Sequence, residues 1–211
     1  MPWKTSPELT AELLQDTLKL PVTLVHQPLP TDAKIIYNAN ADTVYRHMLQ
    51  PSDNFIAEQL LLLCSSTKFK TLNTDSVINY AKANLLADLP DAPVWVDGSG
   101  LSRYNLFTPR SFIKLLCKIQ DAINNEELLH SMLAAGGSSG TVRKAYIMPN
   151  GQPFVWLKTG SFSNNYNQSG YLNTKKGHRL AFSFMNNNFT RPSREIRDEM
   201  VRIITYIHDN Y

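Results

Sequence analysis

The sequence contains few cysteines and no concentrated block of basic residues. Its 211 residues include 2 cysteines and 9 glycines, and the formal net charge is +3 with histidine neutral. This scattered charge argues against nucleic-acid binding, because neutralising phosphates requires a concentrated basic face. The start, MPWKTSPELT, lacks the apolar core of a secretory signal peptide, and no stretch is long enough to span a membrane. With 43% hydrophobic residues, the chain can build one large globular domain or two small ones.

The cysteines and histidines form no metal-binding pattern. Cys64 and Cys117 lie in the apolar runs LLLLC and IKLLCKI, so we expect two small buried residues, and their spacing gives no support to a disulfide. The 5 histidines are far apart and form no HExxH or paired-cysteine motif. The sequence therefore predicts neither a metal nor a cofactor.

Hydrophobic periodicity predicts helices, then strands, then a final helix. The expected helices cover about residues 7–20, 41–48, 52–64, 74–86, 109–123 and 194–209. The expected strands cover residues 22–25, 35–37, 94–96, 154–159, 169–173 and 179–185. Ser6 and Ser52 are expected to cap helices, residues 94–96 to form a short buried strand, and Gly177 to open the last tight turn. This order of elements indicates an α+β domain.

Three short motifs occur in order along the chain. They are Ser52-Asp53-Asn54, then DGSGLSR from Asp97 to Arg103, then KTGS from Lys158 to Ser161. Each is weak alone, because Ser-x-Asn is also an ordinary helix cap and Lys-Thr-Gly also occurs in ordinary turns. Together they are typical of penicillin-recognising enzymes, whose signature is Ser-x-x-Lys, then Ser-Asp-Asn, then Lys-Thr-Gly.

Longer stretches around these motifs resemble a known family. They are MLQPSDNFIAEQLLL, VDGSGLSRYNLFTPRSF, MLAAGGSSGTV and KTGSFSNNYNQSGYLNTKKGHRLAFSFMNN. They are similar to the D-alanyl-D-alanine carboxypeptidase/endopeptidase family of low-molecular-mass penicillin-binding proteins, from about Glu8 to Asn188. The separation of 106 residues between Ser52 and Lys158 (158 − 52) is also similar to that family's.

This resemblance implies a partial serine β-lactamase/DD-peptidase-like transpeptidase fold, with an antiparallel sheet flanked by helices. The helical portion would cover about residues 40–150, and the sheet and terminal helix about residues 151–211. The implied ligands are peptidoglycan stem peptides and β-lactams, without nucleic acid. The implied location is periplasmic or otherwise extracytoplasmic.

The resemblance also assigns catalytic roles. In such enzymes a serine attacks the carbonyl between two D-alanines, D-alanine leaves, and water releases the acyl-enzyme. Ser52 would pass a proton between the nucleophile's lysine partner and the leaving amine. Asn54 would hold the substrate backbone amide, and Lys158 would supply positive charge near Ser52 and the substrate carboxylate.

The remaining candidate site residues would bind substrate. The hydroxyls of Thr159 and Ser161 would contact the terminal carboxylate, and the Ser161 N–H would form half of the oxyanion hole. Gly160 would let the substrate strand lie close to this edge. By resemblance, Ser99 and Arg103 lie near the site. Turn chemistry explains that segment equally well, with Arg103 in a structural hydrogen-bond network, and we favour this interpretation.

The Ser-x-x-Lys motif of the nucleophile is missing from the expected place. It should precede Ser52 by a long stretch, but none of the 51 preceding residues carries it. The literal match Ser65-Ser66-Thr67-Lys68 follows Ser52 by only 13 residues (65 − 52) and ends a helix, where the helix dipole would oppose an anionic intermediate. We therefore expect the C-terminal part of the catalytic domain, inactive in isolation. A recombinant fragment, a proteolytic half and a split-gene product are all compatible with the sequence.

Other interpretations remain open at this point. A penicillin-binding fold without its nucleophile could be an inert module that binds stem peptides or a protein partner, and a helical domain could carry the motifs by chance. The last strand, RLAFSFM at residues 179–185, is apolar on both faces, so its edge is expected to have a neighbour. That neighbour would be a complementary N-terminal chain or a second copy in a homodimer.

Overall fold

The computed structural model describes residues 6–34 and 39–211, and its contacts divide the chain into a unit of residues 1–38 and a unit of residues 39–211. The first unit contains helix α1 (Pro7–Leu18), and the Ser6 hydroxyl accepts a hydrogen bond from the Leu9 N–H at 3.2 Å. This confirms the predicted helix and its cap. Residues 22–25 form no strand, and the predicted strand at residues 35–37 lies outside the described residues.

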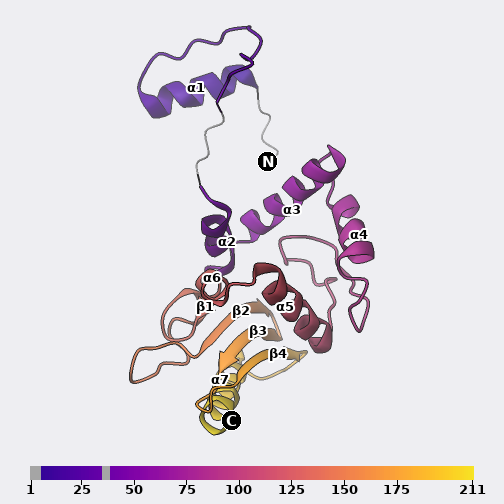
Figure 1. Ribbon diagram of the computed structural model, residues 1–211, viewed down its shortest axis with the longest axis vertical. Coiled ribbons are helices and arrows are strands. Elements are labelled where there is room, and N and C mark those ends of the chain that lie inside the picture. Colours follow the sequence, from indigo (N-terminus) through magenta and orange to yellow (C-terminus); the bar gives the residue numbers. More distant parts are fainter. Residues whose placement is uncertain (1–5, 35–38) are drawn as a thin grey trace. The chain divides into compact units, whose positions relative to one another are not determined.

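The other described elements all belong to the second unit (Figure 1). They are α2 (Ala41–Leu49), α3 (Asn54–Phe69), α4 (Thr74–Asn84), α5 (Pro109–Ile123), α6 (Glu126–Met132), β1 (Ala134–Ala135), the 3-10 helix η1 (Gly140–Val142), β2 (Val155–Phe162), β3 (Asn165–Asn173), β4 (Arg179–Asn187) and α7 (Ser193–Asn210). The sequence predicted the long helices and the last three strands, but not α6, β1 or η1.

The strands form one antiparallel sheet in the order β1-β2-β3-β4, covered by helices on both faces. Val155 of β2 and Leu172 of β3 pack with Ile204 of α7. On the opposite face, Tyr171 of β3 packs with Leu116 of α5. This arrangement confirms the predicted α+β class. The short strand β1 joins the sheet from within the stretch that the sequence assigned to the helical portion.

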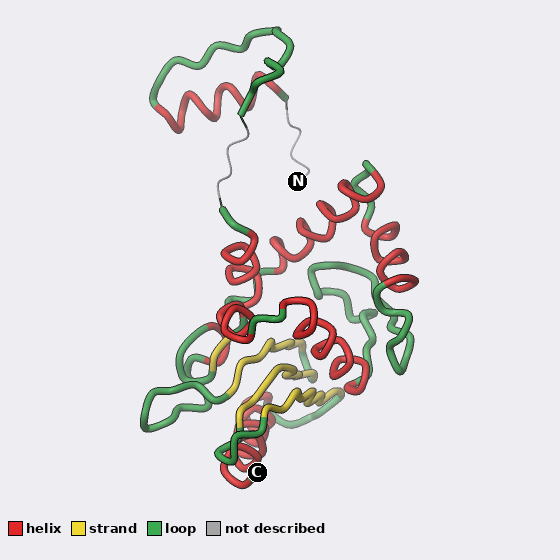
Figure 2. Tube along the Cα trace, viewed as in Figure 1, coloured by secondary structure: helices red, strands yellow, loops and turns green. Residues whose placement is uncertain are grey.

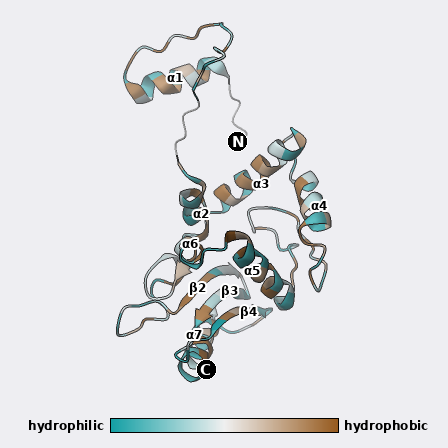
Figure 3. Ribbon diagram, viewed as in Figure 1, coloured by the Kyte–Doolittle hydropathy of each residue, from teal (hydrophilic) through white to brown (hydrophobic). Residues whose placement is uncertain are grey.

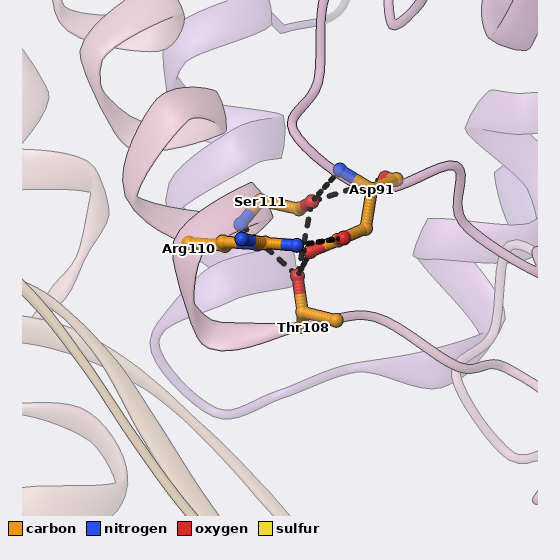
Figure 4. A network of polar contacts seen from close by, with 4 residues as sticks. All are labelled: Asp91, Thr108, Arg110 and Ser111. Atoms are coloured by element: carbon orange, nitrogen blue, oxygen red, sulfur yellow. Dashed lines mark hydrogen bonds and ion pairs between the residues drawn. The ribbon is translucent and has the colours of Figure 1, made fainter.

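The segment between α4 and α5, which carries DGSGLSR, is a long loop (Figure 2). A polar network fastens it to the start of α5 (Figure 4). Asp91 accepts hydrogen bonds from the Arg110 guanidinium (2.6 Å to Nε) and the Thr108 hydroxyl (2.5 Å), while the buried Ser111 hydroxyl donates to the Asp91 carbonyl at 3.0 Å. The hydrogen bonds from Arg110 and Thr108 to the carboxylate lower the pKa of Asp91 to about 2. The carboxylate therefore holds the loop across the neutral pH range.

Two predictions of burial are wrong. Residues 94–96 form no buried strand, because Val94 makes only an isolated bridge to Leu106 and the residue is 49% exposed. Helix α3 carries hydrophobic residues along its length (Figure 3), yet Cys64 on this helix and Cys117 on α5 are both exposed. Consecutive helical residues point about 100° apart, so the neighbours Ser65 and Leu116 take the buried positions.

Candidate active site

Ser52 lies in the turn between α2 and α3 and has a left-handed backbone, with φ of 65°. The prediction that it caps the helix is wrong. Asp53 is the cap, because its Oδ1 accepts a hydrogen bond from the Ile56 N–H at 2.8 Å and the helix begins at Asn54. A carboxylate one residue closer to the helix meets the first-turn N–H groups better. The Ser52 hydroxyl is consequently available to a different partner.

That partner is Lys158, on β2. The Lys158 Nζ lies 2.6 Å from the Ser52 Oγ and donates a second hydrogen bond, also 2.6 Å, to the Thr159 carbonyl. Burial lowers the pKa of Lys158 from 10.5 to about 8, because the ammonium loses hydration. The fold thus joins the two motifs that the sequence separates, and it lowers the pH at which the lysine can lose its proton.

The pair lies beside an open strand edge. The Val155 carbonyl accepts a hydrogen bond from the Gly136 N–H at 2.9 Å, on the β1 side of β2. Successive residues of a strand direct their N–H and C=O groups to opposite sides, so Thr159 and Ser161 direct theirs to the same side as Val155. In the described part of the chain, β1 pairs only with residues 156–157 of β2. A Cβ at Gly160 would meet no heavy atom within 4 Å, so the face of the sheet is open beside this edge.

Thr141 and Gln50 border the site, and sequence reasoning missed both. The Thr159 Oγ1 donates to the Thr141 Oγ1 at 2.9 Å, and the Thr141 N–H donates to the Gln50 carbonyl at 3.2 Å. A Cβ at Gly140, where φ is 61°, would lie 2.6 Å from that carbonyl oxygen. The run AAGGSSGT therefore packs against the turn that carries Ser52. The glycines of this run were the feature from which the contact could have been predicted, because glycine lets two backbones approach closely.

The other predicted residues lie on the elements that flank the pair. Asn54 occupies the first turn of α3 and is exposed. The Ser99 N–H donates to the Glu58 carboxylate of α3 at 2.9 Å, and Arg103 donates to the Ser163 carbonyl, after β2, at 3.3 Å. The DGSGLSR loop thus connects α3 to the β2–β3 turn. These bonds place Ser99 and Arg103 in an internal hydrogen-bond network.

The literal Ser-x-x-Lys match lies at the opposite end of α3. Ser65 is 0% exposed, and its hydroxyl donates to the Thr71 carbonyl at 2.9 Å and accepts from the Asn73 N–H at 3.2 Å. Lys68 lies over the ring of Tyr80, with its Nζ 4.4 Å from the ring centroid. Ser65 therefore joins the end of α3 to the cap of α4, and its hydroxyl is engaged.

We expect penicillin to leave Ser65 unmodified, because its hydroxyl is buried and bonded to the backbone on both sides. Intact-mass spectrometry followed by peptide mapping checks this. The Ser65→Ala variant should instead lose about 1–3 kcal/mol of unfolding free energy in urea titration, since a buried N–H and a carbonyl lose their partner. A penicilloyl group on Ser65 would contradict this structural role.

Within residues 6–34 and 39–211, no helix is both long and apolar enough to cross a membrane. No three side chains of histidine, cysteine, aspartate or glutamate gather there as metal ligands.

The chain is similar in sequence to known carboxypeptidases. The chain is 27% identical over 173 residues to D-alanyl-D-alanine carboxypeptidase DacB of Haemophilus influenzae, covering 79% of this chain and 36% of that protein. It is 30% identical over 115 residues to the penicillin-sensitive carboxypeptidase A of Dictyostelium discoideum, covering 52% of this chain and 22% of that protein. The chain therefore spans about a third or less of the length of these relatives.

Solved structures confirm the predicted fold. Penicillin-binding protein 4 of H. influenzae, in complex with a β-lactam, superposes with a TM-score of 0.62 at 26% identity, covering 79% of this chain and 39% of that one. An extended-spectrum β-lactamase superposes with a TM-score of 0.57 at 15% identity, over 99% of this chain and 72% of that one, and so shows the fold alone. The model of the D-Ala-D-Ala carboxypeptidase 3 (S13) family matches residues 6–207. With nearly the whole chain matched, this protein belongs to the D-Ala-D-Ala carboxypeptidase 3 (S13) family.

Proposed function

We propose that this chain is the C-terminal part of the catalytic domain of a serine-type D-Ala-D-Ala carboxypeptidase, which hydrolyses peptidoglycan stem peptides through an acyl-enzyme. The observation that carries the proposal is the 2.6 Å contact between Lys158 and Ser52 beside an open strand edge. A partly buried lysine beside a serine hydroxyl suits proton transfer, and an unpaired edge suits an extended peptide.

The Ser52–Lys158 pair would serve both halves of acyl transfer. When the nucleophile attacks, its proton passes through the Ser52 hydroxyl to the departing D-alanine amine. Lys158 orients that hydroxyl and adds positive charge beside the substrate's terminal carboxylate. Asn54, exposed at the start of α3, would hold the substrate amide through its side chain. Acid–base assistance of this kind contributes about 10²–10⁴-fold to rates.

The edge of β2 would bind the substrate backbone. The Ser161 N–H points to the open side, where it would donate to the developing oxyanion. Gly160 leaves room for the peptide, since a Cβ there would meet nothing within 4 Å. Thr159 and Ser161 would offer hydroxyls to the terminal carboxylate. The Thr159 and Thr141 hydroxyls lie 2.9 Å apart, so the Thr141 hydroxyl would donate to the Thr159 oxygen once the Thr159 proton turns to the carboxylate.

The nucleophile would come from a Ser-x-x-Lys segment outside these 211 residues. Ser65 does not fit that role, because its hydroxyl is buried and engaged at the opposite end of α3. The expected ligands include β-lactams, since the H. influenzae relative was solved in complex with one. We place the protein outside the cytoplasm, where its peptidoglycan substrate lies.

A peptide ending in D-alanyl-D-alanine should bind at the β2 edge, and nuclear magnetic resonance tests this. We expect the amide signals of residues 159–161 to shift with added peptide, and the L-alanyl-L-alanine peptide to leave them unchanged. Gly160→Val should weaken binding at least about tenfold, or 1.4 kcal/mol, by filling the substrate space. The variant should fold normally, because that space is open in the protein.

Unchanged amide signals at saturating peptide would refute the proposed site. Binding that never leads to D-alanine release, even with a Ser-x-x-Lys segment supplied, would instead indicate an inert peptide-binding module.

A further inference from the structure

We propose that Ser52 and Lys158 form a serine–lysine dyad in which Ser52 itself is acylated by activated esters. This activity goes beyond the proton-relay role of Ser52. The Lys158 Nζ lies 2.6 Å from the Ser52 Oγ, which is the distance that a base needs to remove a hydroxyl proton. Serine–lysine pairs of this kind are a known variant of nucleophilic catalysis.

The backbone of Ser52 supports a nucleophilic role. Its φ of 65° is unusual for a residue other than glycine, and strained residues of this kind cluster at active sites. Serine nucleophiles at strand–helix elbows likewise lie on a strained turn directly before a helix. Ser52 occupies such a turn before α3, a helix of 16 residues. The side chain is partly exposed, so a small ester can reach the Oγ.

The surroundings of Lys158 favour its action as a base. The Thr159 carbonyl accepts one N–H at 2.6 Å, which in the neutral amine leaves the lone pair for the Ser52 proton. Burial lowers the pKa of Lys158 to about 8. The nearest acidic side chain along the chain, Asp53, is engaged as the cap of α3. The cations Arg46 and, when protonated, His47 lie exposed on the last turn of α2.

The acylation step balances without a co-reactant. The Ser52 Oγ forms a bond to the acyl carbon of p-nitrophenyl acetate while its proton moves to the neutral Lys158 amine. The bond between the acyl carbon and the phenolic oxygen breaks, and p-nitrophenolate leaves with the electron pair. The Lys158 ammonium then returns its proton to water. The Ser161 N–H, which the strand alternation directs to the open edge of β2, would donate to the transient oxyanion.

The test uses the 211-residue chain and p-nitrophenyl acetate, with peptide mapping by mass spectrometry. We expect one acetyl group on Ser52, formed at a rate that rises with pH with a midpoint at about 8. Ser52→Ala should remove this adduct. Lys158→Arg should lower its rate by ~100-fold or more, because arginine keeps the charge but cannot act as a base. Thr67→Ala, which removes an exposed hydroxyl at the opposite end of α3, should change nothing.

Acetylation confined to lysines and the N-terminus would overturn the dyad, and so would an acetyl group on the Lys158 amine with Ser52 unmodified. Full Ser52 acetylation in Lys158→Arg would show that charge, not base catalysis, activates the hydroxyl, and would also overturn it. Each result is independent of D-alanyl peptide binding at the β2 edge, so failure here is distinct from failure of the proposed function.

Discussion

Replacing Lys158 by alanine should lower D-alanine release by ~10³-fold in a protein that combines this chain with a Ser-x-x-Lys segment. The variant removes both the partner of the Ser52 hydroxyl and the positive charge beside the substrate carboxylate. Ser52→Ala should have a similar effect, because the two groups act as a unit. Turnover of a D-alanyl-D-alanine peptide measures both. Lys68→Ala, which removes an exposed lysine outside the site, is the matched control and should retain activity.

The stability of the Lys158 variants separates catalysis from folding. A folded-state pKa of about 8, against 10.5 for an unperturbed lysine, means that the unfolded chain holds the proton more tightly. Burying the ammonium therefore costs stability below pH 8, and this cost disappears as pH rises from 8 to 10.5. Lys158→Met should be at least as stable as the wild type at pH 7 in urea titration. Wild-type rates of D-alanine release in Lys158→Ala and Ser52→Ala would remove both residues from the mechanism.

The chain on its own should sediment as a dimer paired through β4. This strand ends the described sheet, so no described strand lies beyond it. The Thr174 N–H donates to the His178 carbonyl at 2.9 Å. From this pair on, every second residue of β4 directs its N–H and C=O groups toward β3, and the residues between them direct theirs away. Ala181, Ser183 and Met185 therefore direct their N–H and C=O groups away from β3. Natural proteins rarely leave such an edge of a half-buried apolar strand without a neighbouring strand. The β4 strand of a second copy can serve as that neighbour, because two identical edges related by a two-fold axis are complementary to each other.

Proline substitutions at neighbouring positions test this edge. Ser183→Pro removes an outward N–H and should yield a folded monomer, whereas Phe182→Pro removes an inward N–H and should also disrupt the β3–β4 ladder. Ser183→Ala controls for the hydroxyl that contacts Ser169 at 2.9 Å. A complementary N-terminal strand, if supplied, should replace the second copy and give a one-to-one complex. A stable wild-type monomer in sedimentation, folded by far-UV dichroism, would refute the predicted pairing.

Local structure was largely readable from neighbouring residues. The helix predicted at residues 109–123, which begins with a proline, has the same limits as α5 in the structure. The alternation in RLAFSFM likewise predicted a strand where β4 lies. The motifs Ser52-Asp53-Asn54 and KTGS, read with their flanking stretches, predicted the family. These features depend on short-range sterics and on the order of residue types, so they are present in the sequence itself.

The helix cap at α3 and the arrangement of the candidate site could be known only from the tertiary structure. They depend on contacts between residues distant in sequence, or on which of two neighbouring residues of similar type occupies a position. Asp53 rather than Ser52 caps α3, although both residue types favour that position. The Ser52–Lys158 contact spans 106 residues and exists because α3 begins opposite β2. The pKa of Lys158 follows from its burial, and the role of Thr141 follows from close packing at Gly140. The sequence by itself determined which groups are present; packing determined which of them meet, and in which protonation state they do so.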